Sequence, residues 1–112
     1  GAAKNKQKEL ELLKAKNELV DIENQIISLF ALLKNNNNYA LSSYNDQKIK
    51  VDLVETVYSN EEKKLSYGAS NSLIISQRKM QLLQTKQALI QKEYELYKSE
   101  VQLKTHTNPI QL

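Results

Sequence analysis

Apolar residues recur along the first third of the chain in alternating steps of three and four. They form one stripe, which comprises Leu12, Ala15, Leu19, Ile22, Ile26, Leu29 and Leu33. This spacing is the a/d pattern of a helix that packs in a coiled coil. The stripe resumes further along at Ala40, Tyr44, Val51, Val54, Tyr58 and Leu65. It is weak between Leu33 and Val51, where Asn36 and Gln47 fall in the stripe. The pattern predicts one long helix over about residues 4–66.

Four consecutive asparagines, residues 35–38, are the one ambiguous part of this predicted helix. Asparagine is a mediocre helix former because its side chain competes for backbone hydrogen bonds. No glycine or proline accompanies the run, and the apolar stripe continues on its far side, so we expect the helix to pass through it. The alternative is a turn at residues 35–38, which would give three helices of about 30 residues each in an up-down-up bundle.

The firm break in the pattern lies at Gly68. The surrounding segment, residues 66–72, is small and polar and separates two apolar-periodic stretches. Glycine readily adopts the left-handed conformation that closes the C-terminus of a helix. Ser70, Asn71 or Ser72 can cap the helix that follows. We therefore expect a tip at residues 67–71.

The stretch after the tip predicts a second helix over about residues 72–104. One apolar row recurs every seven residues and consists of Ile75, Leu82, Leu89, Leu96 and Leu103. Two further rows lie beside it, one of Leu83, Ile90 and Tyr97 and one of Met80, Tyr94 and Val101. This apolar face is wider than a two-stranded seam requires, so the helix should touch more than one neighbour. Pro109 cannot continue a helix, and residues 105–112 are expected to form a tail.

These elements define the predicted fold class, which is all-α: a long antiparallel coiled-coil helical hairpin with unequal arms, in a single unit over residues 1–112. The returning helix is about half as long as the first helix, so it can cover only the half that lies next to the tip. The stripe from Leu12 to Leu33 is then left without a partner inside the chain. Two helices alone bury little apolar surface, so the arrangement predicts self-association or a place within a larger protein.

Composition agrees with long helices and excludes several classes of protein. The chain has 112 residues, with two glycines, one proline, one phenylalanine, no tryptophan and no cysteine, which excludes a disulfide framework. Its net charge of +3 comes from residues scattered along the chain, which is typical of solvated helix faces and not of a nucleic-acid-binding patch. The most apolar run, residues 26–33, is far shorter than the roughly 20 residues of a membrane-spanning helix. We expect no membrane insertion by this segment.

Residue types that carry catalysis occur only as isolated groups. His106 is the single histidine, and metal binding needs two or more converging ligands. The acidic pair Glu61 and Glu62 is followed by lysines, which favours surface ion pairs over acid–base catalysis. No glycine-rich phosphate loop occurs. The sequence predicts a structural protein without enzyme activity, cofactor or metal.

Three segments resemble the TolC-like family of outer-membrane efflux channels. Residues 65–73, Leu-Ser-Tyr-Gly-Ala-Ser-Asn-Ser-Leu, are similar to the turn at the tip of that family's helical hairpin. Residues 76–84 are similar to the start of the family's returning helix, and residues 27–33 are similar to an element of its long helix. The resemblance extends over nearly the whole chain, which would be about a quarter of a full channel protein.

The resemblance implies a periplasmic coiled-coil part of an outer-membrane channel that serves a tripartite efflux pump or a type I secretion system. In that family three chains form a tunnel, and the tips of the hairpins meet a periplasmic adaptor and an inner-membrane pump. The implied partners are therefore the adaptor and the other chains of a trimer. Carried over to this chain, the docking residues are Leu65, Tyr67, Gly68, Ala69, Ser70, Asn71, Ser72 and Leu73.

Two other interpretations remain open at this stage. Residues 65–70 are also similar to the tip of the helical hairpin in periplasmic adaptor (membrane-fusion) proteins, whose hairpin arms are usually matched in length. A free-standing three-helix scaffold module that binds a partner along its side would follow if residues 35–38 formed a turn. These interpretations differ in the length of the first helix, which the structure can decide.

Overall fold

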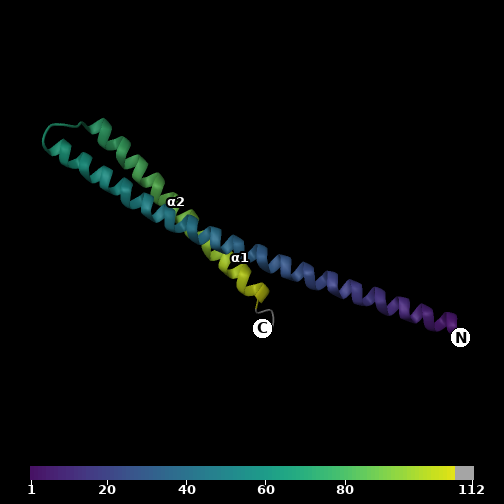
Figure 1. Cartoon of the computed structure of the whole chain (residues 1–112). Helices are drawn as coiled ribbons and strands as arrows, with labels where there is room; N and C mark the ends of the chain where they lie inside the picture. The colour runs from purple at the N-terminus through teal and green to yellow at the C-terminus, as the bar shows by residue number, and fades with distance from the viewer. Residues whose placement is uncertain (108–112) are drawn as a thin grey trace.

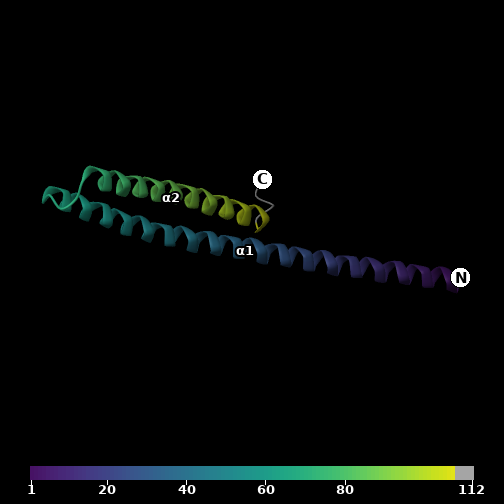
Figure 2. The ribbon, with the colours of Figure 1, turned by 90° about the horizontal axis from the view of Figure 1, so that it is seen from above.

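The computed structural model describes residues 1–107 and consists of two helices joined by a short loop (Figure 1, Figure 2). Helix α1 spans Ala2–Ser66 and has 65 residues, and helix α2 spans Ser72–Thr107 and has 36 residues. The helices lie side by side next to the loop, and α1 continues alone past the end of α2, with overall extents of 100 × 26 × 16 Å. The predicted all-α coiled-coil hairpin with unequal arms is confirmed.

Helix α1 passes through the asparagine run without a break, so the alternative of a turn at residues 35–38 in a three-helix bundle is wrong. The weak helix propensity of asparagine costs only about 0.7 kcal/mol or less per residue, and a continuous helix satisfies the backbone hydrogen bonds of the whole run. Packing also favours the helix, because Asn37 Nδ2 donates a hydrogen bond of 3.1 Å to Ser99 Oγ on α2. The run thus lies in the paired part of the hairpin, where α2 supports it.

The loop at residues 67–71 closes α1 with a Schellman-type motif. Gly68 has a positive φ of 76°. Its N–H donates to Leu65 O at 3.0 Å, and the N–H of Ala69 donates to Lys64 O at 2.8 Å. These two bonds satisfy carbonyl groups that the end of a helix otherwise leaves open. The single interior glycine is therefore the residue that lets the chain turn back.

Polar side chains stabilise both ends of α2. Asn71 Oδ1 accepts the N–H of Ile74 at 3.0 Å, so Asn71 is the N-cap among the three residues considered. At the other end, the expectation that the helix stops at residue 104 is wrong by one turn. The helix continues to Thr107, whose Oγ1 donates to Leu103 O at 2.8 Å. The rest of the predicted tail, residues 108–112, lies outside the described residues.

The two helices meet along a regular seam with a/d spacing on both sides. The seam row of α1 is buried or half-buried and comprises Leu33, Asn37, Ala40, Tyr44, Gln47, Val51, Val54, Tyr58 and Glu61. The seam row of α2 is likewise buried or half-buried and comprises Ile75, Arg78, Leu82, Thr85, Leu89, Lys92, Leu96, Ser99 and Leu103. Every second member of the α2 row is polar, and among residues 1–107 only two hydrophobic residues are buried, Leu33 and Val51. The hairpin therefore has a thin, half-polar core.

The seam uses a different set of α1 positions from the stripe in the first half of the helix. In the first half, the stripe combines the heptad row that begins at Leu12 with a second row three residues later in the sequence. The heptad row continues into the seam at Leu33. From there its companion row lies four residues later and begins with Asn37. The expectation that Asn36 lies in the stripe is therefore wrong, because Asn36 is exposed. This change turns the contact face of α1 by about 50°, since successive residues are about 100° apart.

The first half of α1, residues 2–32, is called the free half below. Every residue from 1 to 32 is exposed, because α2 ends beside residues 26–30 and α1 continues alone beyond it (Figure 2). The exposed residues include the first part of the stripe from Leu12 to Leu29, without the buried Leu33, and a second apolar row of Leu10, Leu13, Val20 and Ile27. A long apolar surface on this half thus has no cover within the described part of the chain.

Candidate docking surfaces

The eight residues predicted for partner docking lie together at the closed end of the hairpin (Figure 1). All of them except Ser70 are exposed. Tyr67 is 84% exposed and Leu73 is 66% exposed, whereas Leu65 is 42% exposed. Tyr67 therefore projects from the end of α1 and does not pack back over its last turn. The tip presents one aromatic and two aliphatic side chains to solvent.

The eight tip residues divide into those that build the turn and those that are free to contact a partner. Gly68 supplies the left-handed residue, and Asn71 uses its side chain to cap α2. Ser70 is half-buried, and its Oγ has no hydrogen-bond partner among the described residues. The side chains of Tyr67 and Leu73 take no part in these bonds, and the two residues lie on opposite sides of the loop in sequence. They are the best candidates for direct contact with another molecule.

The free half of α1 forms a second candidate surface. Its stripe and its second apolar row lie on different sides of the helix, because the two rows are offset by one residue and so by about 100°. At the point where α2 ends, the free half also borders a notch of about 580 Å³, which is lined by Ile26, Ile27, Leu29, Phe30, His106 and Thr107. The apolar lining of this notch continues the stripe under the end of α2.

Helix α2 carries a third candidate surface on the side that faces away from α1. We call it the outer strip, and it consists of Met80, Leu83, Gln87, Ile90, Tyr94, Tyr97 and Val101. All seven residues are exposed. Their spacing alternates between three and four, which makes the outer strip a second a/d seam on the same helix. The wide apolar face expected from the sequence is thus divided between the seam with α1 and this strip.

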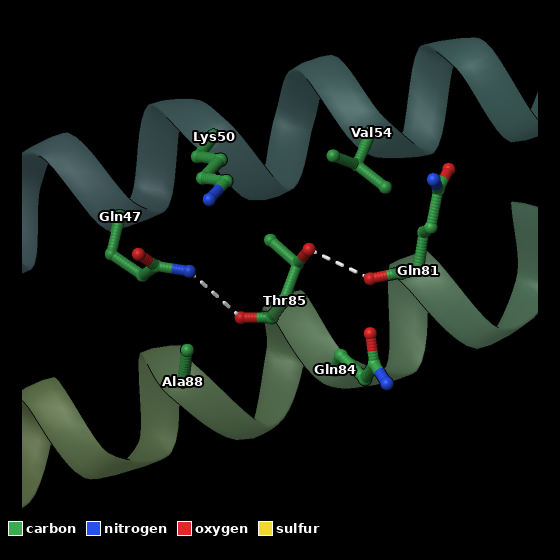
Figure 3. A pocket seen from close by; sticks show the side chains of 7 residues that line it. All are labelled: Gln47, Lys50, Val54, Gln81, Gln84, Thr85 and Ala88. Atoms are coloured by element: carbon green, nitrogen blue, oxygen red, sulfur yellow. Dashed lines mark hydrogen bonds between the residues drawn. The ribbon is translucent and has the colours of Figure 1, made fainter.

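A polar groove of about 430 Å³ opens between the two helices near their middle (Figure 3). Its lining residues are Gln47, Lys50, Val54, Gln81, Gln84, Thr85 and Ala88. Gln47 Nε2 donates to Thr85 O at 3.1 Å, and Thr85 Oγ1 donates to Gln81 O at 2.7 Å. The lining has amides, a hydroxyl and one amine, but no carboxylate or imidazole to act as a general base. The bond from Gln47 to Thr85 joins the helices, whereas the bond from Thr85 to Gln81 lies within α2.

A buried glutamate in the seam near the tip lies next to a partly exposed arginine. Glu61 is 8% exposed, and its Oε1 lies 3.8 Å from Arg78 Nε. The expectation that Glu61 forms a surface ion pair with the lysines beside it is wrong, because Glu61 lies one heptad after Val54 in the seam row of α1. The heptad spacing from Val54 was the signal that could have placed it there.

Neither comparisons with known proteins nor the side-chain chemistry of the chain assigns a function to these surfaces. Within residues 1–107, no three acidic or histidine side chains gather as a metal site, and neither helix has a stretch long and apolar enough to cross a membrane. No protein-family model, curated protein or solved structure matches the chain. The function therefore has to be inferred from the tip, the free half and the outer strip.

Proposed function

We propose that this chain is a periplasmic coiled-coil segment of a TolC-like outer-membrane channel. In this proposal its helices form part of a tunnel wall, and its tip docks to a periplasmic adaptor. The observation that carries the proposal is the inequality of the arms: α1 has 65 residues, α2 has 36 residues, and the free half that results is exposed throughout. A helix that is apolar on more than one side requires several neighbours, as a wall of helices provides.

The unequal arms favour a channel segment over the hairpin of a periplasmic adaptor, whose arms are usually matched. The half-polar seam supports the same choice. With only Leu33 and Val51 buried as hydrophobic residues among residues 1–107, the two helices gain little stability from each other. Neighbouring helices of a wall would supply the missing apolar contacts. Self-association of the segment within a trimer belongs to this proposal.

The tip has the properties of a small docking site. Binding energy at protein interfaces concentrates in a few well-exposed anchors, among which tyrosine is enriched. Tyr67 and Leu73 are such anchors, and the turn at Gly68 holds them on a short loop whose ends are fixed by hydrogen bonds. A preformed loop loses little conformational entropy when it binds. The tip therefore suits the groove of a helical partner.

Binding of the purified chain to the hairpin domains of periplasmic adaptors, measured by biolayer interferometry, tests this proposal. Tyr67→Ala and Leu73→Ala should each weaken binding by about tenfold or more, and Gly68→Val should weaken it by distorting the tip. Helix content by circular dichroism should stay nearly unchanged in all three. Tyr39→Ala is the matched control, because Tyr39 is 75% exposed but lies on α1 away from the tip. Equal binding by the wild type and the tip variants, or no binding to any adaptor, would contradict the proposal.

A further inference from the structure

The outer strip of α2 is a complete coiled-coil seam that nothing in the described chain covers. Its six apolar members are between 43% and 67% exposed, and Gln87 is its one polar member. On a helix with 3.6 residues per turn, the strip lies roughly opposite the row that packs on α1. A strip of this kind on a surface marks a contact with another helix. Its charges indicate which helix that is.

A row of four charged residues flanks the outer strip at intervals of seven. The row consists of Lys79, Lys86, Glu93 and Glu100, and all four are exposed. Two lysines come first and two glutamates follow, so the row changes sign at its own midpoint. Flanking charges set the choice of partner and the orientation of coiled coils. A row that changes sign at its midpoint is complementary to a second copy of itself that runs in the opposite direction.

We propose that the outer strip binds the outer strip of a second copy of this chain, antiparallel about a two-fold axis. The core layers then pair Met80 with Tyr97, Leu83 with Tyr94 and Gln87 with Ile90. The flanking row pairs Lys79 with Glu100 and Lys86 with Glu93. Because a two-fold contact is self-complementary, each of these pairs occurs twice. The interface contains four lysine–glutamate pairs in the flanking row and no pair of like charges there.

Other registers of two outer strips are less favourable. A shift of one heptad in either direction brings Glu93 opposite Glu93, or Lys86 opposite Lys86, at the two-fold axis. Like charges at such positions destabilise a coiled coil. In a parallel pair the same row would face Gln84, Gln91 and Lys98, which allows one ion pair per helix at most. The charge pattern therefore selects one orientation and one register.

Lys86 also pairs within the chain, because its Nζ lies 3.2 Å from Glu55 Oε1 on α1. Both side chains of this pair are about half exposed, and such pairs are weak. Lys86 lies between the seam and the outer strip, so it can interact with Glu55 and with Glu93 of the second copy. Lys79 and Glu100 take part in neither ion pair within residues 1–107, and they give the clearer test.

The pair of hairpins does not depend on the channel proposal. Its two tips point in opposite directions, whereas a tunnel wall needs all tips at one end. The outer strip can therefore serve this pair or a wall, but not both at once. Loss of adaptor binding by the tip variants tests the channel, and the mass of the charge variants tests the pair, so the two proposals can fail separately.

Sedimentation equilibrium on the full chain tests the pair. The wild type should be a dimer, and Lys79→Glu or Glu100→Lys should each weaken dimerisation by about tenfold at low salt, because each replaces two attractive contacts by two repulsive ones. The double variant with both changes should recover the wild-type affinity. Lys14→Glu is the matched control, since Lys14 lies on the free half. A monomeric or trimeric wild type, or a double variant as weak as the single ones, would overturn the proposal.

Cysteine crosslinking tests the orientation, because the chain has no cysteine of its own. Gln87→Cys lies near the two-fold axis, so a short bis-maleimide should join two copies through it. Met80→Cys should not crosslink to itself, because antiparallel packing places the two copies of this position about 25 Å apart along the helices. Efficient crosslinking through Met80→Cys would show a parallel pair and contradict the antiparallel one.

Discussion

Substitution of Gly68 measures how much free energy of unfolding is lost when a residue with a side chain takes a left-handed conformation. Steric clashes do not contribute to this loss. The φ of Gly68 is +76°, and a Cβ added there would meet no heavy atom within 4 Å. A new side chain therefore causes no clash, and its whole effect comes from the backbone conformation. Gly68→Ala should cost about 1–2 kcal/mol of stability. Gly68→Asn should cost less than about 1 kcal/mol, because asparagine tolerates this region, and Gly68→Val should cost the most because of its branched Cβ.

Thermal unfolding followed by circular dichroism at one fixed protein concentration measures this series. A loss of about 1 kcal/mol corresponds to a fall in Tm of roughly 4–8 °C for a chain of this size, so the order of Asn, Ala and Val can be resolved. Ser59→Ala on the exposed face of α1 is the control and should leave Tm almost unchanged. If alanine were as stable as glycine, or valine no worse than asparagine, the reasoning from a strained φ would be refuted.

Three further predictions concern the helices. Asn36→Pro should break α1 at a cost of about 3 kcal/mol or more and shorten the maximum dimension in small-angle X-ray scattering; an unchanged long dimension would contradict a continuous helix. Replacing both Glu61 and Arg78 by leucine should raise the free energy of unfolding in urea by about 1 kcal/mol, because a buried carboxylate with one long contact to a partly exposed arginine gives way to apolar packing; a lower midpoint would refute this. Asn71→Ala should lower Tm through the loss of about 1 kcal/mol of capping energy, whereas Asn71→Ser should retain most of it.

The turn was the most predictable part of the fold because one strict requirement acts there. A helix end of this type needs a residue with positive φ, and Gly68 is the only glycine away from the N-terminus. Periodicity then placed the helices on both sides to within a few residues. Thr107 extends α2 further than expected, because its hydroxyl bonds to the preceding turn and Pro109 acts only on the residues just before it.

The details of the seam could not be predicted because they depend on which face α2 presents to α1. The stripe of the first half points to Asn36, and only the pairing with α2, which half-buries Asn37 and bonds it to Ser99, shows that Asn37 lies in the seam. In the sequence, Glu61 next to lysines is typical of a surface residue. Only the packing of α2 shows that it lies beside Arg78. Such polar positions follow from the pairing of two helices. Periodicity within one helix can indicate that such a residue lies in the seam row, but not which side chain of the other helix it meets.

The candidate docking surfaces were only partly predictable for a related reason. The exposure of Tyr67 depends on the direction in which the chain leaves α1, which the bonds around Gly68 determine. The outer strip was visible as extra apolar rows, but its separation from the seam required knowing which rows α1 covers. An apolar row indicates that another helix packs on it, whereas the charges beside the row are needed to indicate which helix that is.

Helix α1 is one uninterrupted helix of 65 residues, so it sets a fixed distance between its two ends. Partners bound at the tip and at the far end of the free half would be held apart by a length fixed by the backbone, within an overall extent of 100 Å. Adding or removing seven residues in the free half would change that separation by about 10 Å and leave both apolar rows in phase. A change of one or two residues would rotate one end against the other. The distance that α1 spans can therefore change in steps of one heptad while the apolar rows keep their phase.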